Sequence, residues 1–133
     1  MDVKPFHIGV TGSRTGITDE QIEEFHKFIK ALMAGFSLEL HHGDCIGADS
    51  KCHALADKYN IPTHIHPPDK DTYRAFNVGG TMYEPKPYLM RNHDIVDASE
   101  LLFVIPNGPE QLRSGTWATW RYAKRTGTKW III

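Results

Sequence analysis

The chain has few cysteines, no long apolar run and almost no excess of charge of either sign. Its two cysteines, Cys45 and Cys52, lack the paired CxxC spacing of a structural zinc site, which predicts reduced thiols. No apolar stretch approaches the roughly 20 residues that a membrane-spanning helix requires. A formal net charge of −1 gives no general attraction to DNA, RNA or an acidic membrane. These absences argue against membrane and nucleic-acid partners.

The start of the chain, residues 1–4, lacks the charged-then-apolar pattern of a signal peptide. We therefore expect a cytoplasmic protein. With 133 residues and 41% apolar content, the chain is long enough to bury a substantial core. The sequence predicts one soluble domain over residues 1–133.

Strand-like and helix-like patterns alternate along the chain. Strands are predicted near 6–11, 37–42, 61–66, 100–106 and 128–133, and helices near 18–34, 47–59, 87–98 and 114–126. Such alternation is typical of an α/β fold with helices on both faces of a sheet. We expect a Rossmann-like, doubly wound and mainly parallel five-stranded sheet in the order 3-2-1-4-5.

Residues 42–49, His-Gly-Asp-Cys-Ile-Gly-Ala-Asp, are the most informative stretch because they lie where a predicted strand turns into a helix. Ligands of open α/β sheets bind at such corners, and the N–H groups of a helix start favour anions. The alternative is that Gly43 and Gly47 only shape a tight turn.

Two more strand-to-helix corners carry glycine and hydroxyl groups. The first strand ends in Gly12-Ser13-Arg14-Thr15, and Thr18 then opens a helix with a capping-box pattern. The apolar run 101–106 leads through Asn107-Gly108 to Ser114-Gly115-Thr116, where Ser114 can cap a helix. Together the three corners predict a cleft lined by N–H groups and short polar side chains that suits a phosphate or carboxylate.

These motifs, with the Arg91-Asn92 pair, resemble the SLOG superfamily, and most closely its small YspA-like branch. The resemblance runs from about residue 6 to residue 133, and the 42–49 run is its most specific part. Relatives include cytokinin-activating LOG phosphoribohydrolases, DprA-type DNA-processing proteins and sensor domains for nucleotide-derived signals. The resemblance implies a Rossmann-like fold that holds a nucleotide-type ligand at helix starts. The candidate ligand-binding residues are Gly12, Ser13, Arg14, Thr15, Gly43, Asp44, Gly47, Ala48, Asp49, Arg91, Asn92, Gly108, Ser114, Gly115 and Thr116.

The chain departs from the LOG pattern at a catalytic position. LOG enzymes have Pro-Gly-Gly-x-Gly-Thr-x-x-Glu, whereas this chain places Thr119 where the glutamate belongs. Cleavage of an N-glycosidic bond needs a carboxylate, which threonine cannot replace. If catalysis occurs, Asp44 is the candidate carboxylate, and the resemblance assigns substrate activation to Arg91. Asp49 is open to a second interpretation, as a cap at the first turn of its helix.

Residues 67–87 form a long segment without sustained periodicity, which carries Tyr73, Phe76 and Tyr83. Loops of this length in compact domains commonly carry function. We interpret the segment as a lid that stacks a base or shields the cleft; a plain surface loop or a dimer contact is the alternative.

The sequence patterns for metal binding and for a cysteine nucleophile are weaker. His64 and His66 alternate onto one strand face, but no third ligand follows at a telling spacing, so we expect no metal site and no bound cofactor. Cys45 before a helix start is a minor candidate for a nucleophile.

Three functions remain. The first is a sensor or carrier that binds a small nucleotide-type ligand, and the second is a LOG-like nucleotide hydrolase. The third is DprA-like binding of single-stranded DNA, which the balanced charge disfavours. A homodimer stays open.

Overall fold

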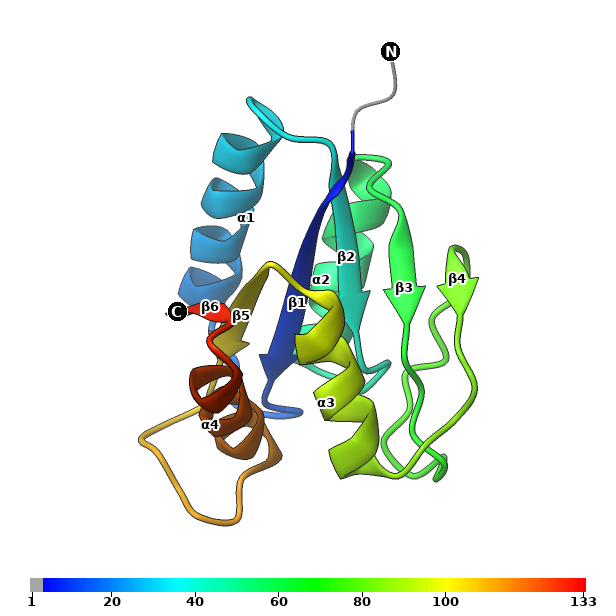
Figure 1. The fold of residues 1–133 in the computed structure, drawn as a ribbon, viewed down its shortest axis with the longest axis vertical. Helices are drawn as coiled ribbons and strands as arrows, with labels where there is room; N and C mark the ends of the chain where they lie inside the picture. Colours follow the sequence, from blue (N-terminus) through cyan, green and yellow to red (C-terminus); the bar gives the residue numbers. More distant parts are fainter. Residues whose placement is uncertain (1–3) are drawn as a thin grey trace.

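The computed structural model describes residues 4–133, so the first three residues of the predicted 1–133 domain lie outside the described part. Helices and strands alternate along most of the chain (Figure 1). The strands are β1 (Phe6–Gly12), β2 (Leu38–His42), β3 (Thr63–Ile65), β4 (Thr81–Met82), β5 (Leu101–Ile105) and β6 (Lys129–Ile132). The helices are α1 (Asp19–Met33), α2 (Ala48–Lys58), α3 (Tyr88–Ala98) and α4 (Gly115–Thr126).

The six strands form one sheet in the order β4-β3-β2-β1-β5-β6, and each neighbouring pair is parallel. The predicted α/β class, the parallel sheet and the relative order of the five expected strands are confirmed. The predicted strand count of five was wrong, because β4 adds a sixth strand at the edge beside β3. β4 is two residues long and exposed, so it has no hydrophobic alternation by which a sequence could reveal it.

Helices cover both faces of the sheet. α1 and α2 pack on one face, where Ile8 and Val10 of β1 meet Phe25 and Ile29 of α1. α3 and α4 pack on the other face, against Leu102 of β5. In Figure 1 all strand arrows point the same way, so their carboxyl ends share one edge of the sheet, next to the starts of α3 and α4.

Local signals set the helix ends. Thr18 makes the expected capping box with Gln21, and Ser114 accepts a hydrogen bond from the N–H of Trp117 at the start of α4. Gly127 ends α4 in the left-handed conformation, with φ of 78°. The caps at Thr18 and Ser114 fix where two loops at the carboxyl edge end and their helices begin.

Within residues 4–133, none of the helices combines the length and the apolar character needed to span a bilayer.

Candidate functional site

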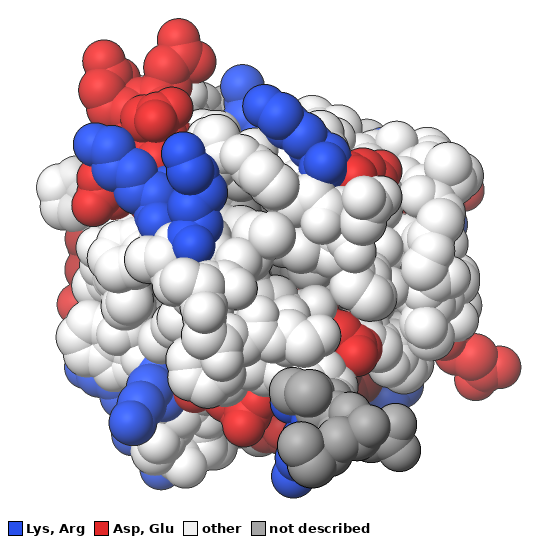
Figure 2. All heavy atoms as spheres, turned by 90° about the horizontal axis from the view of Figure 1, so that it is seen from above, with Lys and Arg blue, Asp and Glu red and all other residues white. Residues whose placement is uncertain are grey.

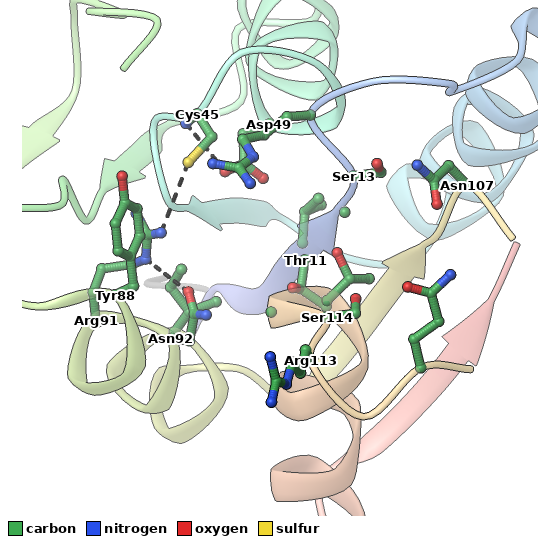
Figure 3. A pocket seen from close by; sticks show the side chains of 17 residues that line it. Thr11, Ser13, Cys45, Asp49, Tyr88, Arg91, Asn92, Asn107, Arg113 and Ser114 are labelled. Atoms are coloured by element: carbon green, nitrogen blue, oxygen red, sulfur yellow. Dashed lines mark hydrogen bonds between the residues drawn. The ribbon is translucent and has the colours of Figure 1, made fainter. Parts of the chain in front are cut away.

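A cavity of about 390 Å³ lies at the carboxyl edge of the sheet, between the end of β1, the start of α3 and the start of α4 (Figure 3). The predicted ligand-binding residues that line it are Gly12, Ser13, Arg14, Asp49, Arg91, Asn92, Ser114, Gly115 and Thr116. The structure therefore brings residues of all three predicted corners into one cavity.

The remaining predicted residues do not line this cavity: Thr15, Gly43, Asp44, Gly47, Ala48 and Gly108. For the glycines of the 42–49 run, packing explains the residue type. Gly47 has φ of +88°, and a Cβ there would overlap the carbonyl groups of Ser13 and Arg14. At Gly43 the guanidinium of Arg91 occupies the space of a Cβ. Backbone conformation therefore explains Gly47, and close packing of Arg91 explains Gly43.

The start of α2 is also occupied from within. The N–H of Ala48 donates to the carbonyl of Ser13 over 3.1 Å, which joins the first two corners. One N–H group of this helix start is therefore already used by the protein's own backbone.

Asp44 is buried and turned away from the cavity. Its backbone has φ of 59°, a conformation that aspartate tolerates better than most residues. Its Oδ2 accepts from Arg74 Nε at 2.8 Å, and its Oδ1 accepts from the backbone and side-chain amides of Asn77, both at 2.9 Å. Because these bonds occupy both carboxylate oxygens, Asp44 holds residues 67–87 in place. It does not line the cavity, so its position does not suit the catalytic role predicted for it.

Asp49 is the carboxylate that lines the cavity instead. Its Oδ2 accepts from the N–H groups of Gly43 and Cys45, both at 3.2 Å, so it holds the preceding loop rather than capping its own helix. Its Oδ1 is buried and has no hydrogen-bond partner among the described residues. Burial raises the pKa of Asp49 to about 6, against the opposing effects of Arg91 and the two N–H groups.

Arg91 is buried beside Asp49, and most of its donors are used inside the protein. Nη1 donates to the carbonyls of Gly43 and His66, and Nε donates to Asn92 Oδ1 at 2.7 Å. Nη2 lies 3.8 Å from the sulfur of Cys45 (Figure 3). Since the guanidinium ties β2, β3 and α3 together, it presents little free hydrogen-bonding capacity to a ligand.

The groups that suit an anion lie on the other side of the cavity. Arg113 and Ser114 line it at the start of α4 (Figure 3), and Arg14 lines it after β1. The N–H groups of Gly115 and Thr116 stand in the first turn of α4, where a helix has no acceptor for them. A helix start next to Arg113, in a cavity that Arg14 also lines, favours a phosphate or carboxylate. Ser13 contributes less than expected, because its hydroxyl donates to the carbonyl of Thr15 at 2.7 Å.

Comparison with solved structures identifies the fold. A molybdenum cofactor binding protein from Rippkaea orientalis matches with a TM-score of 0.76 and 17% identity, over 98% of this chain and 77% of that one. DNA processing protein A from Streptococcus pneumoniae matches with a TM-score of 0.74 and 20% identity, over 96% of this chain and 50% of that protein. The molybdenum cofactor carrier protein of Chlamydomonas reinhardtii matches with a TM-score of 0.70 and 17% identity, over 97% of this chain and 76% of that one.

The chain shares its α/β fold with these proteins, although each shares less than a quarter of its residues with this chain. No protein-family profile matches the sequence, and no curated protein matches it either. The fold agrees with the one that the motif resemblance implied.

Thr119 is the residue that the motif resemblance places at the position of the LOG glutamate. Its side chain is buried, lies outside the cavity lining, and donates to the carbonyl of Gly115 at 2.8 Å. Cys45 does line the cavity, but burial raises its thiol pKa, with Asp49 adding to the effect and Arg91 opposing it. A raised pKa disfavours the thiolate that a nucleophile needs.

The 67–87 segment meets the cavity at its edge. None of the cavity-lining residues in the described chain comes from it. Its Tyr73 ring lies 3.8 Å from the guanidinium of Arg14, which does line the cavity. The N–H of Ile46 donates to the carbonyl of Tyr73 at 3.0 Å, so the segment is pinned to the 42–49 corner.

The cavity is also lined by residues that were not predicted as ligand-binding: Val10, Thr11, Tyr88, Ile95, Asn107, Gln111 and Arg113, together with Cys45, which was predicted only as a minor candidate nucleophile. Arg113 carried a usable signal, since it directly precedes the Ser114 cap. Tyr88 and Ile95 could not be selected, because only the direction of α3 brings them to the cavity.

Proposed function

We propose that this protein binds a nucleotide or nucleotide-derived ligand as a sensor or carrier. The observation that supports it is the pairing, within one cavity, of a cationic helix start with the unpartnered carboxylate oxygen of Asp49. The phosphate would lie at Gly115 and Thr116 between Arg14 and Arg113. A ribose hydroxyl or base amino group would donate to Asp49.

The size of the cavity fits this class of ligand. Small-molecule sites commonly enclose about 300–1,000 Å³, and this one has about 390 Å³. The similar structures of molybdenum cofactor binding and carrier proteins support a small-molecule ligand for this fold without specifying which. We therefore include the molybdenum cofactor beside nucleotides in the test.

A LOG-like phosphoribohydrolase is the second candidate, because a carboxylate with a raised pKa in a cleft is a feature of catalytic sites. In this candidate function, Asp49 rather than Asp44 would be the catalytic carboxylate. DprA-like DNA binding receives less support. On the face shown in Figure 2, lysine and arginine are interspersed with aspartate and glutamate, and they form no continuous basic stripe.

The test is a thermal-shift screen with nucleoside mono-, di- and triphosphates, ADP-ribose, NAD, cyclic nucleotides and the molybdenum cofactor, followed by an assay for free base. A ligand at 100 times its Kd stabilises by about 2.7 kcal/mol, which raises Tm by several degrees. A shift with intact ligand supports a sensor or carrier, and released base supports the hydrolase.

Two variants test the site itself. Arg14→Ala removes a cation, and Gly115→Leu fills the cavity where no neighbour lies within 4 Å of the new Cβ. Both should keep the fold and lose the ligand, whereas Arg125→Ala, near the other end of α4, should bind normally. Unchanged affinity in both variants, or no response to any ligand, would reject the proposed site.

The oligomeric state and the cellular location are tested by separate experiments. Trp130 and Ile132 on the edge strand β6 are 39% and 40% exposed, and they are the side chains we propose for a homodimer. Light scattering at several concentrations measures the oligomeric state, and cell fractionation tests the proposed cytoplasmic location.

A further inference from the structure

Three histidines and a glutamate gather on the sheet face that α3 and α4 cover, outside the cavity. In the register of the sheet, His7 of β1 is beside Glu39 of β2, and His41 of β2 is beside His64 of β3. Residues that alternate along parallel strands project from one face, so these four come from three neighbouring strands to one place. Sequence reasoning had paired only His64 with His66.

The ring nitrogens of these histidines converge. One nitrogen each of His7, His41 and His64 lies within 4.8 Å of the other two. His7 Nδ1 is 2.8 Å from His41 Nε2. The rings of His41 and His64 stack with centroids 4.2 Å apart and an interplanar angle of 9°. Three imidazoles at this spacing can share one ion, since metal binding needs three or four converging donors.

Outer contacts hold the rings in place. His41 Nδ1 shares a hydrogen bond with His66 Nε2 at 2.9 Å, and His64 Nδ1 shares one with the Tyr83 hydroxyl at 2.8 Å. The ring of Tyr83 also stacks on His66, with centroids 4.3 Å apart. Metal-ligating histidines almost always have such a partner on the other nitrogen.

Charge and access also favour a cation. Glu39 Oε1 lies 2.5 Å from His64 Nε2, so an anionic oxygen stands at the imidazole that would bind. The side chains of His64 and Glu39 are 14% and 23% exposed, which leaves a route from solvent.

We propose that His7, His41 and His64, with Glu39 as an oxygen ligand, bind one divalent transition-metal ion. Imidazole donors suit zinc, copper and nickel, whereas magnesium and calcium prefer oxygen ligands. The site is separate from the ligand cavity, because none of its four residues lines that cavity.

The experiment is calorimetric titration of tag-free, chelator-stripped full-length protein with zinc chloride. The expected result is one ion per chain. Cobalt(II) provides a second measurement, since a four-coordinate nitrogen and oxygen site absorbs visible light much more strongly than free aqueous cobalt does.

Variants locate the ion. His7→Ala and His64→Ala should each weaken zinc binding by at least tenfold, and Glu39→Gln should weaken it less. His93→Ala is the matched control, because His93 stacks on Tyr122 outside the cluster and should leave zinc affinity unchanged. Circular dichroism checks that each variant is folded. Three outcomes would overturn the proposal. The wild type could bind less than one zinc ion per chain, or bound cobalt could absorb no more strongly than aqueous cobalt. The folded His7→Ala and His93→Ala variants could also bind zinc with equal affinity.

Discussion

Arg74 Nε donates a 2.8 Å hydrogen bond to Oδ2 of Asp44, whose side chain is fully buried. This ion pair joins two segments that sequence reasoning treated as separate, the 42–49 corner and the long segment 67–87. The N–H of Ala75 also donates to the carbonyl of Asp44 at 2.8 Å. The two segments therefore behave as one structural unit beside the cavity.

Removing one partner of this pair should destabilise the protein strongly. Arg74→Ala leaves a buried carboxylate without its cation, which typically costs about 3–5 kcal/mol. Urea unfolding measures the change. Arg121→Ala is the control, because its partner Glu110 has a side chain that is 47% exposed and such surface pairs contribute about 0–1 kcal/mol. Equal losses in the two variants would contradict a special role for the buried pair.

The raised pKa of Asp49 makes the stability of the protein depend on pH in a definite direction. Its pKa of about 6 lies above the ordinary 3.8, so the folded state holds the proton more tightly than the unfolded state. The resulting stability is fully present below pH 3.8 and is lost as pH rises through 6. Asp49→Asn does not titrate, so its stability relative to wild type should rise by about 3 kcal/mol across that window. Urea unfolding at pH 4 and pH 8 measures this, and a difference that stays constant would refute the assignment.

Two glycines of the cavity should respond differently to alanine. A Cβ at Gly12 would overlap the Cβ of Ala48 and lie 3.0 Å from the carbonyl oxygen of Ile105. Overpacking of this kind costs about 1–3 kcal/mol. A Cβ at Gly115 meets nothing within 4 Å, so Gly115→Ala should keep wild-type stability. Thermal unfolding of both variants checks the contrast, which would fail if Gly12→Ala were neutral.

Arg113 should contribute to affinity rather than to stability. It is exposed at the cavity and has no salt bridge in the described chain. A hydrogen bond to a charged group contributes about 1.5–3 kcal/mol, so Arg113→Ala should weaken binding of a phosphate-bearing ligand roughly 10–100-fold. Calorimetry with the best ligand from the thermal screen measures this. If Arg113→Ala bound the ligand with the wild-type Kd, the phosphate would not bind at the start of α4.

The helix caps were predictable because they depend on local patterns, and the sheet order followed from the handedness of crossovers between parallel strands. Apolar periodicity marked β5 and α1, and the hydroxyl residues Thr18 and Ser114 stood where helices begin. The side-chain directions at the site were not predictable. Asp44 and Asp49 are five residues apart in one motif, yet a left-handed backbone at Asp44 turns its carboxylate to Arg74 and leaves Asp49 at the cavity.

The histidine cluster shows a second limit. His7 and His41 are 34 residues apart, and only the register of β1 with β2 brings their nitrogens to 2.8 Å. No spacing rule for metal ligands covers such a separation, because the sheet rather than a local motif sets the distance.

One stretch of chain touches both proposed sites. Tyr73 packs on Arg14 at the cavity, and Tyr83 packs on His66 and bonds to His64 at the histidine cluster. Any ordering of this backbone by an occupant at one end would change the entropic cost of binding at the other. Thermodynamic reciprocity then requires that the factor by which an ion strengthens ligand binding equal the factor by which the ligand strengthens ion binding.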